Sequence, residues 1–261
     1  MTNPSLTVLI PTHAVKTELI GPYKNNPQHN ATAPSTRLIE AAISSINTNL
    51  DIDKQFLIGL DHKSDQDISN AYLNNLKSLQ EKYDNVDVTH VSHTASENVL
   101  TTYSATENFF NLIDTCKTEY FLLWEHDWIL TKSMDTDKIK LWENGIEFLR
   151  FNQFINSQED HGCVKKLWKD EKGLRTDRFS NNPFITSKQV WYEKYKPLAE
   201  NIPDWWGINP VDGLDYGAFI EGPIQRYLDN NPDKIDNYKI HLYGDYGDEP
   251  FIAHLNGQVW R

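Results

Sequence analysis

The sequence predicts an α/β fold in which a mainly parallel sheet is flanked by helices on both faces. Between residues 7 and 124, short apolar runs alternate with segments whose apolar residues recur at helical spacing. Polar clusters follow the apolar runs at Ile10, Leu60 and Trp124, and in a parallel sheet such positions share the edge where ligands bind. The chain has 261 residues and no linker-like segment, so we expect one domain.

The first half supplies four strand candidates and three amphipathic helices. The expected strands are 7–10, 55–60, 86–91 and 120–124, and the expected helices carry their apolar faces over 38–46, 72–83 and 109–116. Ser35 or Thr36 can cap the first helix. The second half is less regular, with a strand expected over 148–154 and helices over 188–195 and 219–228, the last with Pro223 in its first turn.

Composition excludes several classes of protein. The chain has 25 basic and 37 acidic residues and a net charge of −12, which disfavours duplex nucleic acid as a partner. Its apolar runs, such as 121–124, are far shorter than the roughly 20 residues of a transmembrane helix. Residues 1–12 lack the pattern of a signal peptide, so a cytoplasmic protein is expected. Cys116 and Cys163 are too few for a disulfide framework, and we expect ordinary buried thiols.

The sharpest local feature is a pair of carboxylates, Glu125 and Asp127, that flank His126 directly after an apolar run. Hard cations such as Mg²⁺ and Mn²⁺ prefer oxygen ligands, and proteins hold them with one or two carboxylates plus substrate phosphates. The pattern therefore indicates a metal site at a strand end. The alternative is a pair of solvated loop charges after an edge strand.

Several segments, taken in order, resemble the family 2 glycosyltransferases of the GT-A fold. The segments are 7–12 (the opening strand and its Pro-Thr turn), 41–46 (the first helix), 59–65 (the second-strand motif), 104–108 (a helix with its Asn) and 118–127 (the strand entering the acidic motif). The match covers roughly residues 6 to 130. His13, Leu60 and His62 depart from the family pattern, as does a loop of about twenty residues before the first helix, which leaves the donor's base and sugar open.

The resemblance implies a nucleotide-sugar-binding half, about 1–130, and an acceptor-binding half, about 131–261. It implies that Pro11 and Thr12 line the base and ribose, and that Asp61 contacts the base. The alternative for Pro11 and Thr12 is a strand terminator, and for Asp61 a strand-end turn residue.

The same resemblance implies that Asp127, with help from Glu125, holds a divalent cation, Mn²⁺ or Mg²⁺, on the diphosphate of a UDP- or GDP-sugar. Some GT-A enzymes use a late histidine as a third metal ligand, and His254 lies in a suitable apolar segment. The alternative for His254 is a hydrogen-bonded core residue. His126 is expected to lie near the metal or at the surface without binding it, and Arg37 is a helix-surface charge or a phosphate contact.

Inverting transfer also needs a base that deprotonates the acceptor hydroxyl, and a carboxylate can serve. The candidates are Glu221, then Asp215, then Asp212. Glu221 stands between apolar residues at a helix start, which resembles the position of the family's catalytic acid. The alternative is a helix N-terminal acid that the helix dipole stabilises. Trp205 and Trp206, beside turn residues, are the candidate platform for an acceptor sugar.

Our first hypothesis is a metal-dependent glycosyltransferase that moves a hexosyl or related sugar, with inversion, from a nucleotide sugar to a glycan or other hydroxyl acceptor. A second is a nucleotidyltransferase, although the first strand lacks the Gly-rich or basic phosphate loop such enzymes normally show. A third is a non-catalytic carbohydrate-binding protein on the same fold.

Overall fold

The computed structural model describes residues 5–13, 34–61, 66–91, 101–157, 166–200 and 220–255. Its strands are β1 (Leu6–His13), β2 (Lys54–Asp61), β3 (Val86–Val91), β4 (Tyr120–Leu123), β5 (Trp128–Leu130), β6 (Phe148–Arg150), β7 (Leu167–Asp170), β8 (Gly173–Thr176), β9 (Phe184–Ser187), β10 (Ile240–Leu242) and β11 (Ile252–His254). Its α-helices are α1 (Arg37–Asn49), α2 (Gln66–Lys82), α3 (Thr101–Thr115), α4 (Thr136–Ile139), α5 (Leu141–Asn144), α6 (Lys188–Val190), α7 (Lys196–Glu200) and α8 (Glu221–Asn230). A π-helical turn, η4 (Trp191–Tyr195), joins α6 to α7, and a 3-10 helix, η5 (Pro232–Tyr238), follows α8.

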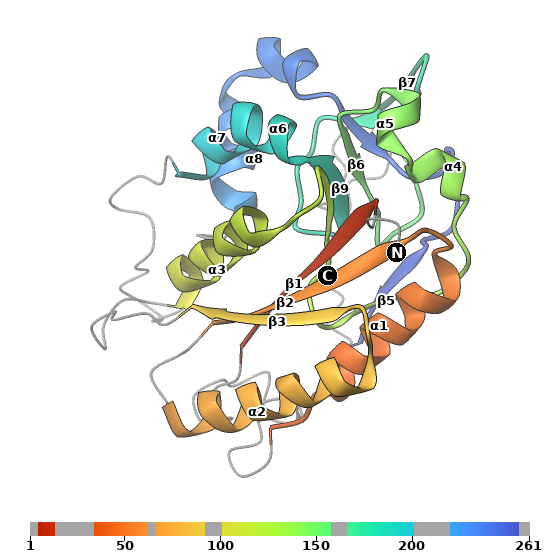
Figure 1. Cartoon of the computed structure of the whole chain (residues 1–261). Helices are drawn as coiled ribbons and strands as arrows, with labels where there is room; N and C mark the ends of the chain where they lie inside the picture. Colours follow the sequence, from red (N-terminus) through yellow and green to blue (C-terminus); the bar gives the residue numbers. More distant parts are fainter. Residues whose placement is uncertain are drawn as a thin grey trace.

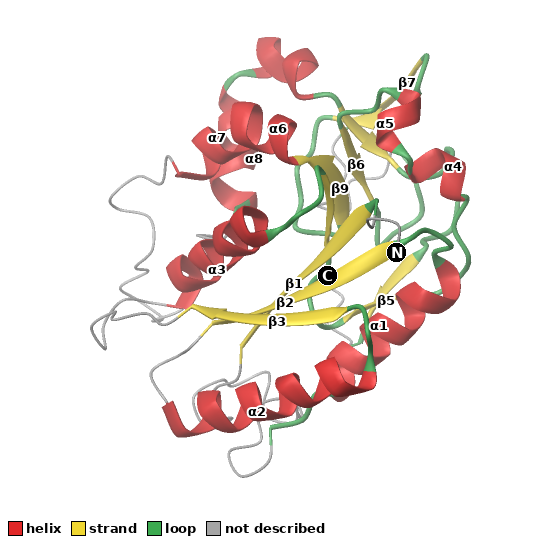
Figure 2. Ribbon diagram, in the orientation of Figure 1, coloured by secondary structure: helices red, strands yellow, loops and turns green. Residues whose placement is uncertain are grey.

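Within these residues, nine strands form one sheet in the order β3-β2-β1-β4-β9-β6-β10-β8-β7. Helices α1 and α2 lie on one side of this sheet, and α3, α6, α7 and α8 lie on the other (Figure 1). Figure 2 shows the same three layers by type of secondary structure. The predicted α/β fold, a mainly parallel sheet flanked by helices, is confirmed.

The first four strands of the chain pair with one another in parallel, as the strand–helix alternation predicts. Strand β1 runs on through Pro11 to His13, three residues beyond the predicted end. Its pairing with β4 stops at Leu9, opposite Leu123, and beyond that point it pairs with β2 alone. Proline has no amide hydrogen to donate, and it lies where the ladder on one side has already ended.

The antiparallel pairings lie in the second half of the sheet. Strand β9 is antiparallel to both β4 and β6, and β10 joins β6 in parallel. Strands β7 and β8 form a hairpin at the edge, and β5 pairs with β11 in a separate two-stranded sheet. The strand expected over 148–154 ends at Arg150, the helix expected over 188–195 continues as α6, η4 and α7 to Glu200, and α8 begins at Glu221 with Pro223 in its first turn. The division into donor and acceptor halves stays a prediction.

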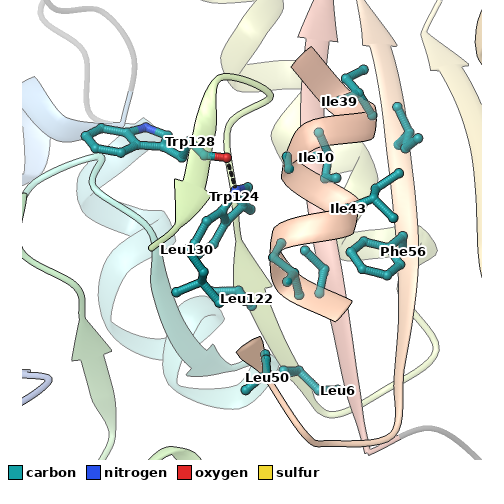
Figure 3. Packing of buried hydrophobic residues seen from close by; sticks show 14 of the residues in the cluster. Leu6, Ile10, Ile39, Ile43, Leu50, Phe56, Leu122, Trp124, Trp128 and Leu130 are labelled. Atoms are coloured by element: carbon teal, nitrogen blue, oxygen red, sulfur yellow. Dashed lines mark hydrogen bonds between the residues drawn. The ribbon is translucent and has the colours of Figure 1, made fainter. Parts of the chain in front are cut away.

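The core lies in two layers, one on each face of the sheet. Alternate residues of a strand point to opposite faces, so Leu122 packs with the cluster under α1 and α2, while Phe121 and Leu123 pack with the cluster under α3 and α8. Figure 3 shows the first cluster, in which residues of α1 such as Ile39 and Ile43 meet Ile10 and Phe56.

Smaller predictions have mixed outcomes. Of the two expected caps of α1, Thr36 donates its hydroxyl to the Glu40 carboxylate, 2.8 Å away, and caps no backbone amide, whereas the hydroxyl of Ser35 accepts from the amide of Arg37 at 3.2 Å. Cys116 is a buried free thiol, as expected, and Cys163 lies outside the described residues. None of the helices in the described ranges is long and apolar enough to cross a membrane.

Candidate functional site

Pro11, Thr12 and Asp61, which are expected to bind the donor, lie side by side at the carboxyl ends of β1 and β2. In this register, Thr12 lies opposite Leu60 and His13 lies opposite Asp61. Asp61 is only 1% exposed, which is unusual for a strand-end turn residue. The Thr12 hydroxyl is 3.2 Å from the hydroxyl of Tyr72 on α2, so it is engaged by the protein's own core. The nucleotide contacts expected of Pro11, Thr12 and Asp61 stay predictions.

The acidic turn that follows β4 is fixed by Trp124, whose side chain is fully buried. Its backbone amide donates to the carbonyl of Leu9 on β1, at 2.9 Å. Its indole Nε1–H donates to the carbonyl of Trp128, at 2.8 Å (Figure 3). One side chain therefore closes a loop of three residues, Glu125, His126 and Asp127, onto the end of the parallel sheet.

Strand β5 leaves this turn and is held from two sides. On one side, the amide of Leu130 donates to the hydroxyl of Ser45 on α1, at 3.1 Å. On the other, β5 pairs with β11, which sets His254 opposite Trp128. The amide of Leu255 then donates to the carbonyl of Asp127, at 2.7 Å. This pairing carries a residue from the end of the chain to the acidic turn.

His254 and Asp127 are in contact as a result. Imidazole Nε2 of His254 lies 3.0 Å from carboxylate Oδ2 of Asp127, and both side chains are largely shielded from solvent. The ring of His254 also meets the indole of Trp128 edge to face, with 4.8 Å between centroids. Two of the three residues proposed from the sequence as metal ligands thus share one location.

The two carboxyls of the turn have opposite electrostatic surroundings. Burial, with the charges of Asp127 and Glu221, raises the pKa of Glu125 to about 8. Burial also acts to raise the pKa of Asp127, but the influence of His126 and the hydrogen bond and charge of His254 outweigh it, so this pKa lies below its ordinary value. At neutral pH, Glu125 is therefore mostly protonated and Asp127 is ionised, a separation typical of functional sites.

Asp127 and His254 form part of a candidate metal site. Within the described ranges, no group of three or more His, Cys, Asp or Glu side chains is arranged to hold an ion. Asp127 and His254 nevertheless offer one carboxylate and one imidazole, which suit Mn²⁺ and related cations. A cation held by few protein ligands is ordinarily completed by substrate phosphates and water. These residues fit a cation that binds together with a diphosphate.

Glu221, the first residue of α8, lines a pocket of about 460 Å³. Helix α8 lies on the sheet through Ile224 and Leu228, which belong to the core cluster on that face. The residues that line the pocket are polar or charged except for Gly222, and they come from α8 and from the segment between β8 and β9. The lining residues are Arg178, Asn181, Glu221, Gly222, Gln225, Arg226, Asp229 and Asn230.

The carboxylate of Glu221 is held by the segment 178–182. It accepts hydrogen bonds from the hydroxyl of Ser180 and from the backbone amide of Asn181. Burial raises the pKa of Glu221, and the positive charges of Arg150 and Arg178 and these two hydrogen bonds oppose the rise without cancelling it. Because the charge of Glu221 also raises the pKa of Glu125, the pocket and the acidic turn belong to one electrostatic site.

Four residues expected at the site, Asp212, Asp215, Trp205 and Trp206, lie outside the described residues. Arg37 is the exposed first residue of α1, and its contact with a phosphate stays a prediction. His126 is partly buried, and its ring meets that of His13 edge to face, with 5.9 Å between centroids.

The residues around Glu221 were not singled out in the sequence. Ser180 and Asn181 lie in a turn-rich stretch with no distinguishing pattern. Arg150 carried a usable signal, because it is a charged residue between Leu149 and Phe151 in an otherwise apolar run. Such a residue is buried with a partner or lies at a functional site.

Comparison with known proteins gives a fold and no family. No family model and no curated protein sequence matches the chain. Among solved structures, it is similar to S. aureus TarS 1–349 in complex with UDP, with a TM-score of 0.52 and 11% identity over 95% of this chain and 59% of that one. A second structure of S. aureus TarS 1–349 gives a TM-score of 0.49 at 11% identity over the same shares, and S. aureus TarS gives 0.46 at 12% identity over 72% of this chain and 29% of that one.

The chain therefore spans less than two thirds of the length of the UDP-complexed fragment. At 11% identity, this likeness establishes the fold alone. The chain has an α/β fold, a mainly parallel sheet flanked by helices, that is similar to the fold of this fragment.

Proposed function

We propose that the chain is a metal-dependent glycosyltransferase that transfers a sugar, with inversion, from a nucleoside-diphosphate sugar to a hydroxyl acceptor. The observation that carries the proposal is the contact between Asp127 and His254, 3.0 Å apart at the carboxyl end of β4. It lies in a fold similar to that of a protein solved with UDP. Ligands of open α/β sheets bind at this edge, and β1, β2 and β4, whose carboxyl ends lie there, belong to three of the segments that resemble family 2.

In this proposal, the nucleotide of the donor lies over the ends of β1 and β2, near Asp61, and its diphosphate lies at the acidic turn. Asp127 and His254, with Glu125 beside them, would hold the divalent cation. When bound there, such an ion would neutralise charge on the departing nucleoside diphosphate. UDP is the nucleotide we expect, because the similar structure was solved with it.

Glu221 acts as the base. The acceptor hydroxyl oxygen attacks the anomeric carbon of the donor from the side opposite the diphosphate. As the new carbon–oxygen bond forms, the bond from the anomeric carbon to the diphosphate oxygen breaks with its electron pair, and the hydroxyl proton passes to the Glu221 carboxylate. The burial of Glu221 raises its pKa, which makes it a stronger base than a solvated carboxylate. The polar pocket beside it is the expected acceptor site.

The test is thermal stability with UDP, GDP, ADP and CDP, each with and without Mn²⁺. A ligand that binds only the folded state stabilises it by about 2.7 kcal/mol at one hundred times its Kd. We expect a rise in Tm with UDP that requires Mn²⁺ and is lost in Asp127→Ala. The matched control is Asp51→Ala, an exposed carboxylate before the amino end of β2, at the opposite edge of the sheet.

Absence of a metal-dependent shift with all four nucleotides would contradict the donor site. Where UDP does bind, release of UDP from UDP-sugars measures turnover. Binding without turnover by the wild-type protein would favour the non-catalytic carbohydrate-binding alternative.

A further inference from the structure

Arg150 is a charged residue inside the protein. Its side chain is 0% exposed, although it ends a strand, β6, whose other residues are apolar. The strand is central in the sheet, with Arg150 opposite Phe184 of β9 on one side and Leu242 of β10 on the other. Burying a guanidinium is costly unless the charge is compensated and hydrogen-bonded. Something in the fold must therefore account for it.

The side chain points to the face of the sheet that α8 covers. Arg150 and Phe148 are two residues apart on one strand and so share a face, and Phe148 packs in the cluster that includes Ile224 of α8. Guanidinium Nη1 of Arg150 donates to the carbonyl of Arg178, at 2.8 Å. That carbonyl begins the segment 178–182.

The segment 178–182 in turn holds Glu221 through Ser180 and Asn181. Its other attachment is Gln225 of α8, whose side-chain oxygen accepts from the amide of Phe179 at 2.6 Å. The segment is thus fixed by Arg150 from the sheet and by Gln225 from the helix. Arg150 also exerts the largest of the influences that oppose the raised pKa of Glu221, ahead of the two hydrogen bonds and Arg178.

We propose that Arg150 is a positioning residue for Glu221, supplying the buried counter-charge to this carboxylate and holding the segment that donates hydrogen bonds to it. The inference rests on the proposed function in taking Glu221 as the base. The charged or titratable groups around Glu221 are Arg150 from β6, Arg178 from the 178–182 segment and Glu125 from the acidic turn. On α8 itself, Arg226 and Asp229 line the same pocket.

The first test needs no turnover. Glutamate carboxyl carbons are labelled with ¹³C, the Glu221 resonance is assigned by its loss in Glu221→Gln, and its titration is followed in wild type, Arg150→Met and Arg150→Lys. Loss of a close opposite charge moves a carboxyl pKa by about 1–3 units, so we expect an upward shift of that size in Arg150→Met. Arg150→Lys, which keeps the charge, should restore most of it.

The matched control is Arg175→Met. Arg175 is also buried, but its guanidinium pairs with Asp236 at 3.1 Å and with Asp170 at 3.7 Å. We expect it to leave the Glu221 titration unchanged. An unchanged midpoint in Arg150→Met, or an equal shift in Arg175→Met, would overturn the proposal.

A double-mutant cycle of Tm values tests the pairing of Arg150 with Glu221 even where Arg150→Met folds poorly. Replacing Arg150 leaves the Glu221 carboxylate buried without its counter-charge, whereas Glu221→Gln removes that carboxylate. Arg150→Met should therefore lower Tm less in the Glu221→Gln background than in wild type. Equal losses in the two backgrounds would contradict the pairing.

Kinetics give a third readout. Arg150→Met should lower kcat for UDP release from the donor while leaving the donor KM within about twofold, because Arg150 acts on the base and not on the nucleotide. The acidic limb of its kcat profile should move to higher pH, since a base with a raised pKa stays protonated to higher pH. A rise in KM with kcat unchanged would contradict the proposal. Failure of wild type to bind any nucleotide would instead count against the proposed function, and the titration would still test the pairing.

Discussion

Imidazole Nε2 of His254 lies 3.0 Å from carboxylate Oδ2 of Asp127, although the two residues are far apart in the sequence. The pairing of β5 with β11 produces this contact, since it sets His254 opposite Trp128, the residue after Asp127. Both side chains are largely shielded from solvent.

His254→Ala should raise the Mn²⁺ concentration needed for UDP-dependent stabilisation by about tenfold or more, which is the scale on which residues that orient a metal ligand act. The measurement is a Mn²⁺ titration of Tm at fixed UDP. His90→Ala, which removes an exposed imidazole on β3, is the control. An unchanged Mn²⁺ requirement in His254→Ala would show that His254 neither binds the cation nor orients Asp127.

Glu125 predicts a pH dependence of stability in the metal-free protein. Its pKa is about 8 in the folded state and about 4.3 in an unfolded chain. Between these values the folded state holds a proton that the unfolded state has released. Raising the pH through this window therefore lowers the free energy of unfolding, by up to about 1.4 kcal/mol per pH unit. The contribution is fully present below pH 4 and is lost as the pH passes 8.

Glu125→Gln keeps a neutral side chain at every pH and removes this term. We expect its stability relative to wild type to rise between pH 5 and pH 8.5, measured by urea unfolding in EDTA. Glu81→Gln, at an exposed position on α2, is the control and should track wild type. Parallel pH profiles for wild type and Glu125→Gln would contradict the raised pKa of Glu125 in the folded protein.

The local part of the site could be predicted from the sequence, and the distant part could not. The apolar run of β4 and the acidic residues that follow it are adjacent in the sequence. The prediction that Glu125 and Asp127 lie just after the end of a strand is therefore confirmed. The strand β5, three residues long, and its partner β11 are too short to show a period. The contact of His254 with Asp127 depends on that pairing, so the sequence offered His254 only through a resemblance.

The surroundings of Glu221 illustrate the same limit. The sequence predicts a helix that begins near Glu221, and α8 does begin at this residue. The groups that hold this carboxylate come from β6 and from the segment after β8, far away in the chain. Their order in the sheet, β9-β6-β10-β8, follows no sequential rule. Only tertiary structure brings Arg150 to Glu221.

The backbone at Gly59, near the end of β2, leaves no room for a side chain. A Cβ atom at this position would lie 2.5 Å from side-chain Oδ1 of Asn108 and 2.8 Å from Cγ of Leu112, both on α3. Asn108 is itself fixed, because its side-chain amide donates to the Gly59 carbonyl at 2.7 Å. Gly59→Ala should therefore destabilise the fold by about 1–3 kcal/mol, the usual cost of overpacking.

The measurement for Gly59→Ala is urea unfolding, alone and combined with Asn108→Ala. Removing the Asn108 side chain relieves the closest contact, so the two substitutions together should cost less than the sum of each alone. If the two losses of stability simply add, β2 moves away from α3 in Gly59→Ala and the new methyl group does not press against Asn108. Because Asp61 follows Gly59 by two residues, UDP affinity should fall in the single variant as well.

Replacing Trp124 should reduce both the stability of the fold and the binding of the nucleotide. Trp124→Phe deletes the 2.8 Å hydrogen bond from indole Nε1 to the Trp128 carbonyl, and a buried carbonyl left without its donor costs about 1–3 kcal/mol. The matched control is Trp191→Phe. Trp191 is equally buried, but its Nε1 has no hydrogen-bond partner in the described part of the chain. The same substitution there removes aromatic volume alone.

The difference between the two variants therefore isolates the hydrogen bond. In urea unfolding, Trp124→Phe should lose more stability than Trp191→Phe. It should also weaken Mn²⁺-dependent UDP binding, because the bond closes the turn that carries Asp127. Trp191→Phe should bind UDP as wild type does, since its ring packs between α3 and the sheet, against Phe109 and Phe184. Equal UDP affinity in the two variants would show that the turn keeps its shape without the indole, and that β5 and β11 alone hold Asp127 in place.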